Sequence, residues 1–113
     1  MTERLEIRGL PRAFHEILVL AGLREGPKHG YQVALDIEER SGGAFEVGHG
    51  TLYPILHQME EAGLIDGRWS REGGRRRKEY EITPAGQVHL EARTEAWRAL
   101  QERLDRFVDA TAA

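Results

Sequence analysis

Apolar residues recur at helical spacing along much of this chain, and most clearly within residues 47–63. Four of them fall at i, i+3, i+4 and i+7, the spacing of one buried helical face: Leu52, Ile55, Leu56 and Met59. Gly63 follows and can end a helix by adopting a left-handed conformation. The pattern predicts a short helix that buries one side against a core.

The opposite side of this predicted helix carries small and polar side chains. At about 100° per residue, the front and its flanks hold Gly50, Thr51, Tyr53, Pro54, His57, Gln58 and Glu61. Pro54 has no N–H group and therefore belongs near the helix start. Such a helix can enter a DNA major groove with its N-terminal end nearest the base edges, although an ordinary surface helix shows the same pattern. The candidate DNA contacts are Thr51, Tyr53, Pro54, His57 and Gln58.

Two further helices are predicted before this one. The first runs over residues 11–23, and the second runs from residue 28 or 29 to residue 40 and ends at a Ser-Gly-Gly sequence. Residues 44–47 alternate between apolar and polar side chains, which predicts one short strand. Near the N-terminus, Arg4, Arg8 and Arg12 would share a helical face. That face is either a basic stripe that contacts phosphate or a solvated, frayed end.

The hydrophobic period changes from 3.6 to 2 after Gly63. Ile65, Gly67 and Trp69 point to one side and the residues between them to the other, which predicts a strand. Residues 72–74 predict a hairpin tip, because glycine adopts positive φ at little cost, and a return strand follows over residues 76–82. Three helices followed by this hairpin make a winged helix-turn-helix domain over residues 1–83, with the hairpin as its wing.

A long last helix is predicted from Thr83-Pro84, an N-cap hydroxyl followed by proline, to about residue 109. It carries an apolar heptad seam that Arg93 interrupts, formed by Leu90, Trp97, Leu100, Leu104 and Phe107. A single helix that extends past a small domain cannot bury this seam alone. Residues 84–113 are therefore expected to join two copies of the chain. The predicted fold is mainly α with a small β-hairpin, a winged helix-turn-helix plus a long C-terminal dimerisation helix.

Composition sets limits on the class of protein. The 113 residues, 40% hydrophobic and 31% charged, suit one soluble globular domain. No apolar run is long enough to span a bilayer and the N-terminus lacks a signal-peptide core, so we expect a cytoplasmic protein without membrane association. With no cysteine, neither a disulfide framework nor a thiolate metal site is expected.

The distribution of charge matters more than its sum. A net charge of −3 argues mildly against nucleic-acid binding. Six cations nevertheless lie within eleven residues of the predicted hairpin, opposed there by Glu72: Arg68, Arg71, Arg75, Arg76, Arg77 and Lys78. A hairpin of this size can reach a phosphate backbone, although charged edges also keep an exposed hairpin soluble. The candidate backbone contacts are Arg75, Arg76, Arg77 and Lys78.

No catalytic or metal-binding motif is evident. None of the five histidines forms an i, i+4 pair with the carboxylate that a zinc-binding helix uses. The wing glycines lack the spacing and the lysine of a phosphate-cradling loop, and there is no nucleophile elbow. We therefore expect no metal, no cofactor and no enzymatic activity.

Several motifs in this sequence are similar to those of a known family. The run at residues 50–60, Gly-Thr-Leu-Tyr-Pro-Ile-Leu-His-Gln-Met-Glu, with Gly-Leu-Ile at 63–65, resembles the signature of the PadR family of bacterial transcriptional regulators. Supporting matches are Gly-Pro at 26–27, His-Gly-Tyr at 29–31, Gly-Gly-Arg at 73–75, Lys78 with Tyr80, and Thr-Pro-Ala-Gly at 83–86. The resemblance covers about residues 10–108. Met59 stands where leucine is usual, and Gly48 stands where a capping serine or aspartate is usual.

The resemblance implies a homodimer joined through the last helix, as in the short members of the family. It further implies binding to double-stranded DNA at an inverted-repeat operator, repression, and release by a small effector. In short members the dimer centre can enclose a pocket for flat aromatic or cationic compounds. Here that pocket would involve Trp97, with Ala13, Phe14 and Ile17 of the first helix. Trp97 could equally be a plain dimer-core residue.

Two other functions fit the same residues. A winged helix can bind protein in place of DNA. The chain could also be a small-molecule-sensing module with weak DNA binding.

Overall fold

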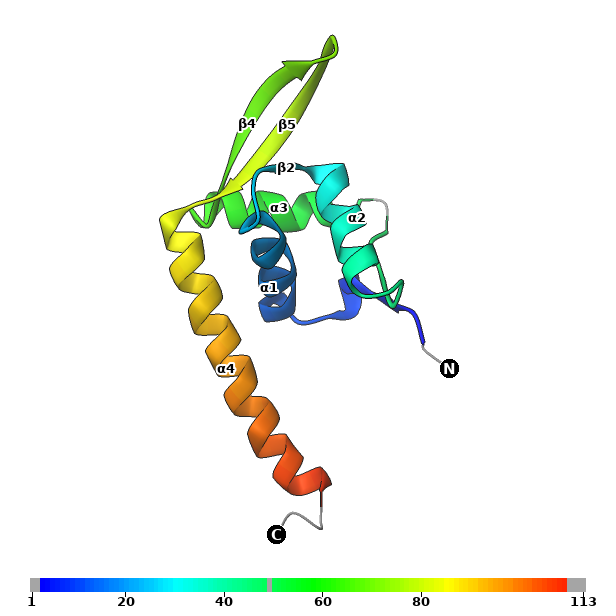
Figure 1. Cartoon of the computed structure of the whole chain (residues 1–113), viewed down its shortest axis with the longest axis vertical. Helices are drawn as coiled ribbons and strands as arrows, with labels where there is room; N and C mark the ends of the chain where they lie inside the picture. Colours follow the sequence, from blue (N-terminus) through cyan, green and yellow to red (C-terminus); the bar gives the residue numbers. More distant parts are fainter. Residues whose placement is uncertain (1–2, 49, 110–113) are drawn as a thin grey trace.

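The computed structural model describes residues 3–48 and 50–109, and it confirms the predicted fold class (Figure 1). The elements follow the order β1 (Leu5–Glu6), η1 (Ile7–Gly9), α1 (Arg12–Leu23), β2 (Lys28–His29), α2 (Gly30–Arg40), β3 (Phe45–Glu46), α3 (Leu52–Glu61), β4 (Ile65–Glu72), β5 (Arg75–Ile82) and α4 (Pro84–Val108). The β4–β5 hairpin projects from the helical body on one side, and α4 extends away from it on the other (Figure 1). In residues 3–48 and 50–109, no helix has both the length and the hydropathy needed to cross a bilayer.

The core lies where α1, α2 and α3 meet the base of the hairpin. Its buried side chains are Ile7, Val19, Leu20, Leu23, Val33, Ile37, Leu52, Ile55, Leu56, Met59, Leu64, Ile65, Tyr80 and Leu90. All four periodic residues of α3 belong to this set, so the prediction of its buried face is confirmed. Burial of each large aliphatic side chain contributes about 1.5–3 kcal/mol, so this contact decides how α3 is oriented.

The wing is a regular antiparallel hairpin with one additional strand. Its register runs from Ile65 opposite Ile82 to Glu72 opposite Arg75. Gly73 and Gly74 form the turn with φ of 60° and 77°, the positive values that a tight two-residue hairpin turn requires. Residues 28–29 were predicted as a helix start, but they form β2 and pair with β5 at Tyr80 and Glu79. This third strand ties the base of the wing to the body.

The N-terminal segment does not form the helix that the arginine spacing suggested. Residues 5–6 pair in parallel with residues 45–46, and the buried side chain of Ile7 anchors the short 3-10 turn that follows. Arg4 instead pairs with Glu46 at 2.9 Å, and Arg12 lies on α1. The prediction that the three arginines share a helical face is therefore wrong. Strand pairing and the burial of Ile7 determine the local conformation, and the spacing of the arginines does not.

The start of α4 is hydrogen-bonded directly to the loop that follows α3. The Thr83 hydroxyl accepts from the Gly86 amide at 3.0 Å and donates to the Gly63 carbonyl at 2.7 Å. The Thr83 amide donates to the Leu64 carbonyl at 3.1 Å. The predicted hydroxyl cap is thus confirmed, and it also holds the first turn of α4 against the loop after α3.

The first turns of α4 pack on α1 of the same chain, which changes one expected interface residue. Leu90 is only 2% exposed and belongs to the core of a single chain. Its assignment to the dimer interface is wrong, because α1 already covers this part of the seam. Farther along, Trp97 is 38% exposed, and Leu100, Leu104 and Phe107 are more exposed. The division at residue 83 stays a prediction, although the first turns of α4 share the core of the winged helix.

Arg93, which interrupts the heptad pattern, pairs with a buried carboxylate on α1. Glu16 is 4% exposed. Its Oε1 lies 3.2 Å from Arg93 Nε and 2.9 Å from His89 Nε2, and its Oε2 lies 3.7 Å from Arg12 Nε. A buried carboxylate needs such partners. The polar residue in the seam therefore fixes the contact between α1 and α4.

Gly86→Ala is expected to destabilise the protein, although alanine normally favours a helix over glycine by about 1 kcal/mol. A Cβ at Gly86 would lie 2.1 Å from the Leu64 carbonyl oxygen, a backbone atom that cannot rotate away. We expect a loss of about 1–3 kcal/mol in the free energy of unfolding, measured by denaturant titration at fixed protein concentration. The neighbouring variant Gln87→Ala, at an exposed position, should stay within about 0.5 kcal/mol of wild type. Equal stability of Gly86→Ala and wild type would contradict this close approach.

Candidate nucleic-acid interface

The exposed side of α3 presents four of the five side chains expected there. Because the apolar back of the helix is buried, Tyr53, Pro54, His57 and Gln58 lie on the surface. Tyr53 is 64% exposed. His57 Nε2 lies 2.6 Å from the Glu61 carboxylate one turn farther along, and both side chains are exposed. The helix front is therefore small and polar, with an aromatic hydroxyl near its N-terminal end.

Thr51 differs from this expectation, because its side chain is turned inward. It is 8% exposed, and its hydroxyl accepts from the Arg8 guanidinium at 3.3 Å. Thr51 is the N-cap residue of α3, and its side chain makes no capping hydrogen bond. The prediction that this hydroxyl contacts DNA directly is therefore wrong, because the hydroxyl is buried beside Arg8. Arg8, one of the three arginines considered from the sequence as a basic stripe, is an exposed cation beside the start of α3.

The inner face of the wing combines an aromatic ring with cations. The register places Trp69 opposite Lys78, and Arg71 opposite Arg76, on the same face. The Arg76 guanidinium carbon lies 4.5 Å from the centroid of the Trp69 ring, within the range of a cation–π contact. The indole thus supports Arg76 while both side chains stay exposed.

Like charges are also held close together on this face. Arg71 and Arg76 face each other directly across the strands, an arrangement that destabilises a hairpin by itself. An anion placed between or beside them relieves this repulsion. Toward the base of the outer face, Arg68 lies opposite Glu79 and Asp66 opposite Glu81, so the net positive charge is concentrated in the outer half of the wing.

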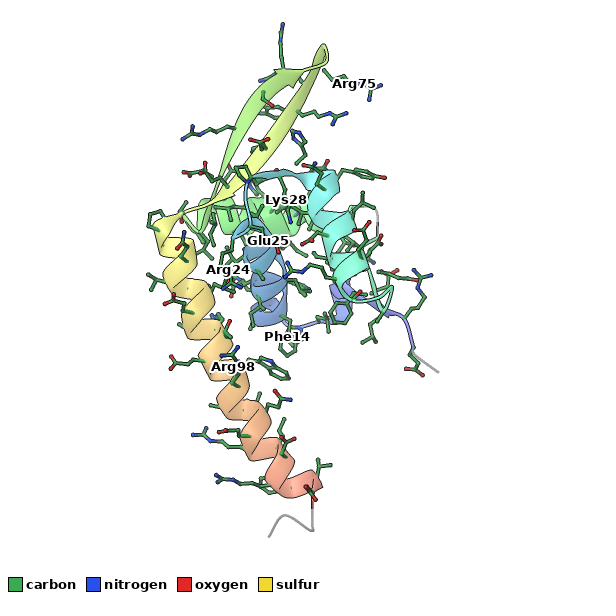
Figure 2. All side chains as sticks on the ribbon, in the orientation of Figure 1. Phe14, Arg24, Glu25, Lys28, Arg75 and Arg98 are labelled. Carbon is green, nitrogen blue, oxygen red and sulfur yellow. The ribbon has the colours of Figure 1, made fainter. Side chains whose placement is uncertain are left out.

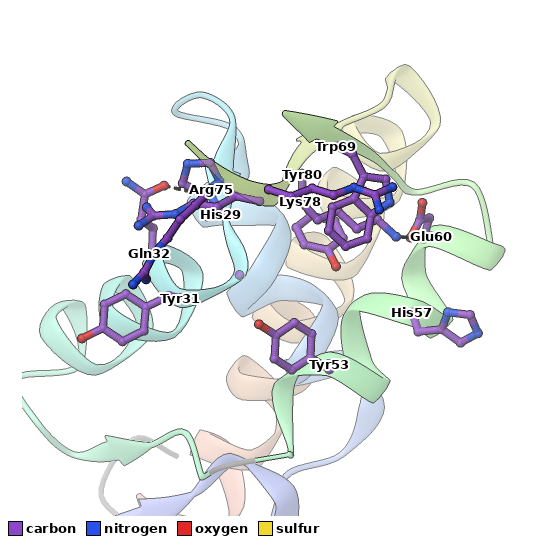
Figure 3. A pocket seen from close by; sticks show the side chains of 13 residues that line it. His29, Tyr31, Gln32, Tyr53, His57, Glu60, Trp69, Arg75, Lys78 and Tyr80 are labelled. Atoms are coloured by element: carbon purple, nitrogen blue, oxygen red, sulfur yellow. Dashed lines mark hydrogen bonds and ion pairs between the residues drawn. The ribbon is translucent and has the colours of Figure 1, made fainter. Parts of the chain in front are cut away.

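The front of α3 and the inner face of the wing line one open groove (Figure 3). The start of α2 forms a third side of this groove, whose volume is about 690 Å³. The lining residues are His29, Gly30, Tyr31, Gln32, Tyr53, His57, Glu60, Trp69, Arg75, Arg76, Arg77, Lys78 and Tyr80. The structure therefore brings Tyr53 and His57 of α3 together with the wing candidates at residues 75–78, whereas Pro54 and Gln58 are exposed but do not line this groove.

Lys78 has a different environment from the three arginines beside it. Its ammonium lies 2.8 Å from Glu60 Oε1 on α3, and this hydrogen bond raises the pKa of Lys78 above its ordinary value. Arg75, Arg76 and Arg77 are exposed, whereas Lys78 is half-buried. Burial likewise raises the pKa of Tyr80, whose ring lies 5.5 Å from the same ammonium, so its phenol stays protonated. Sequence reasoning identified Lys78 but missed its partner Glu60.

Two further aromatic residues of the groove were not predicted as site residues. Trp69 was recognised only as a strand residue, although its period-2 position on the face of Lys78 was visible in the sequence. Tyr31 is exposed at the start of α2 and became part of the groove only through the packing of α2 beside α3.

The residues expected to form an effector pocket lie elsewhere, on α1 and α4, and Ile17 lines a separate hollow beside α2. The Phe14 and Trp97 rings meet edge to face, with centroids 5.5 Å apart and planes at 88°. Ala13 and Ile17 are half-buried on the same helix as Phe14. Figure 2 shows Phe14 near the end of α1 that points away from the wing. Arg75 is labelled near the tip of the wing, at the opposite end of the domain. This aromatic pair is therefore spatially separate from the groove.

Metal ligands are not clustered in the described part of the chain. Among residues 3–48 and 50–109, no group of three or more His, Asp or Glu side chains is arranged to hold a metal ion. His49, one of the five histidines considered from sequence, lies outside the described residues.

Comparisons with known proteins agree with this arrangement. Residues 19–92 match the model of the transcriptional regulator PadR-like family. The chain is 35% identical over 96 residues to a transcriptional regulator of Mycobacterium tuberculosis, covering 85% of this chain and 84% of that protein.

Two solved structures are similar to the whole fold or to most of it. A transcriptional regulator from Clostridium thermocellum has a TM-score of 0.80 and 27% identity, covering 86% of this chain and 95% of that one. The PadR of Bacillus subtilis, solved in complex with operator DNA, has a TM-score of 0.65 and 26% identity over 73% of this chain and 46% of that one.

Proposed function

This chain belongs to the PadR-like family of transcriptional regulators, and we propose that it represses transcription by binding an inverted-repeat operator in double-stranded DNA as a homodimer, until a small effector releases it. The motif resemblance seen in the sequence is thereby confirmed at the level of the family. A family of transcriptional regulators also agrees with the expectation that the chain is not an enzyme.

One observation carries the DNA-binding part of this proposal. The polar front of α3 and the exposed arginines of the wing line the same groove. A helix of this shape fits the major groove, while an arginine-rich hairpin beside it can bind the neighbouring phosphate backbone. Tyr53, Pro54, His57 and Gln58 would contact the major groove, and Arg75, Arg76 and Arg77 the backbone. The relative from Bacillus subtilis was solved in complex with operator DNA, which supports DNA binding by this chain.

The exposed half of α4 supports the homodimer. Trp97, Leu100, Leu104 and Phe107 are exposed apolar residues at heptad spacing on a helix that leaves the body of the domain. A second copy would cover this strip and relate two α3 helices by a two-fold axis. A spacing of roughly 34 Å between them matches one turn of DNA and predicts a two-fold operator.

The contact between Phe14 and Trp97 supports release by a small effector. Trp97 is only partly covered by Phe14 and lies beside the proposed dimer strip. Two copies would bring two such indoles near each other, and indole faces bind flat aromatic or cationic compounds. An effector held there would act on DNA binding through the contact of α1 with α4.

Arg75→Ala combined with Arg76→Ala is expected to weaken binding to all DNA sequences. Each lost phosphate contact should also reduce the slope of log K against log salt by about 0.9. Fluorescence anisotropy with the DNA upstream of the chain's own gene, and with unrelated duplex DNA, measures both effects across a salt series. Arg98→Ala with Arg106→Ala removes the same charge from α4 and should keep the slope. Unchanged affinity of the wing variant would remove the wing from the interface.

Leu104→Glu is expected to dissociate the homodimer, because it places a charge in the centre of the apolar strip. Sedimentation velocity should show a shift from dimer to monomer at micromolar concentration. Val88→Glu is the matched control, since Val88 is exposed on the opposite side of α4 and should leave the dimer intact. A Leu104→Glu protein that remains dimeric would place the contact between copies elsewhere.

A planar aromatic cation is expected to quench the fluorescence of Trp97 in a saturable manner. The chain has two tryptophans, so the measurement uses Trp69→Phe and a phenanthridinium dye in the absence of DNA. Phe14→Ala in the same background should weaken the interaction, because it removes the ring against which the indole packs. Quenching that rises linearly without saturation would leave Trp97 as a plain dimer-core residue.

A further inference from the structure

One ion pair connects the middle of the wing to α3. Lys78 Nζ on β5 lies 2.8 Å from Glu60 Oε1 on α3, and the two side chains are 27% and 29% exposed. The base of the hairpin is anchored through Ile65 and Tyr80 in the core and through the pairing of β2 with β5. Lys78 lies two residues beyond Tyr80 toward the tip. The pair therefore binds the wing to α3 beyond the point where core packing ends.

The path of the Lys78 side chain explains a glycine in the opposite strand. Gly67 lies opposite Tyr80 in β4. A Cβ added there would lie 2.3 Å from Lys78 Cε and 3.0 Å from Glu60 Oε2. The lysine thus crosses β4 over a position without a side chain on its way to the carboxylate. Gly67 on β4 thus leaves the space through which Lys78 on β5 reaches Glu60 on α3.

We propose that Lys78 is a positioning residue of the DNA-binding surface, and that its pair with Glu60 sets the angle between the wing and α3. This inference rests on the proposed function, and it changes the role expected for Lys78 from a phosphate contact to an internal strut. The exposed arginines and the front of α3 then reach the backbone and the major groove at the same time. A wing held in this position loses less conformational entropy when DNA binds.

The surroundings of the two kinds of cation distinguish these roles. The ammonium of Lys78 already has a carboxylate as hydrogen-bond partner, and a phosphate bound there would lie beside the negative charge of Glu60. Both cations lie over the uncharged Trp69 indole, Arg76 at 4.5 Å and Lys78 at 5.9 Å from its centroid, but Lys78 also has the Glu60 carboxylate beside it. Arg75, Arg76 and Arg77 thus bind phosphate at lower cost than Lys78 does.

Glu60→Gln gives opposite results for the two roles of Lys78. If Lys78 contacts phosphate and only the charge of the surface determines DNA affinity, removal of the Glu60 carboxylate should strengthen binding. If the pair positions the wing, the isosteric Glu60→Gln should weaken binding to the DNA upstream of the chain's own gene by about fivefold. Glu81→Gln on the outer face of β5 is the matched control, and it should bind at least as tightly as wild type.

Lys78→Met completes a double-mutant cycle. We expect it to weaken binding about as much as Glu60→Gln, the double variant to be no weaker than either single variant, and the salt slope to stay at the wild-type value. A Lys78→Met protein that loses about 0.9 in salt slope, together with a Glu60→Gln protein that binds as tightly as wild type or more tightly, would overturn the proposal and make Lys78 a phosphate contact.

Limited trypsin digestion of the DNA-free protein tests the strut independently of DNA binding. A loosened wing should be cut faster after Arg75, Arg76 or Arg77 in Glu60→Gln than in wild type and Glu81→Gln, with the cut site identified by mass spectrometry. Equal cleavage rates would overturn the strut even if the protein binds DNA. Failure of the wild-type protein to bind DNA would instead overturn the proposed function and leave the digestion result valid.

Discussion

Burial of the apolar face of α3 is the interaction on which the rest of this structure depends. Leu52, Ile55, Leu56 and Met59 enter the core shared by α1, α2 and the base of the hairpin. Because these four residues occupy one side of a ten-residue helix, the opposite side must face solvent. The orientation of Tyr53, His57 and Gln58 is thus a consequence of hydrophobic burial, and no polar interaction is needed to turn them outward.

The elements around α3 are attached to its end and to its side by polar contacts of defined geometry. Thr83 and Gly86 bind the start of α4 to the loop after α3, and Glu60 binds the wing through Lys78. Glu16 on α1 forms close polar contacts with His89 and Arg93 on α4. Apolar packing tolerates small rotations, whereas hydrogen bonds require particular distances and angles. These contacts therefore define the directions in which the wing and α4 leave the core.

Charge is distributed in accordance with this geometry. The chain is acidic overall, yet arginines dominate the outer half of the wing, and three of its four carboxylates, Asp66, Glu79 and Glu81, belong to the half toward the base. Close arginines such as Arg71 and Arg76 cost stability in the free protein. Such a cost is common where a surface is suited to an anionic partner, because the partner relieves the repulsion on binding.

The sequence by itself determined the helices, the hairpin, the buried face of α3 and the start of α4. Each of these depends on residues close together in the chain: hydrophobic period, glycine at a turn, a hydroxyl followed by proline. It also located most of the candidate site, since exposed arginines and the polar front of a helix are local features. The sequence did not predict the short strands β1 and β2. A strand of two residues is too short to show a hydrophobic period, and it forms only by pairing with a strand distant in sequence.

Only the tertiary structure decided the roles of Leu90, Thr51, Arg93 and Lys78. Periodicity shows that Leu90 lies on an apolar face, but not that α1 of the same chain covers it. The inward turn of Thr51 depends on Arg8, and the positions of Arg93 and Lys78 depend on Glu16 and Glu60. Each partner lies between 18 and 77 residues away along the chain. A local pattern specifies which side of an element is polar or apolar, whereas packing alone specifies what meets that side.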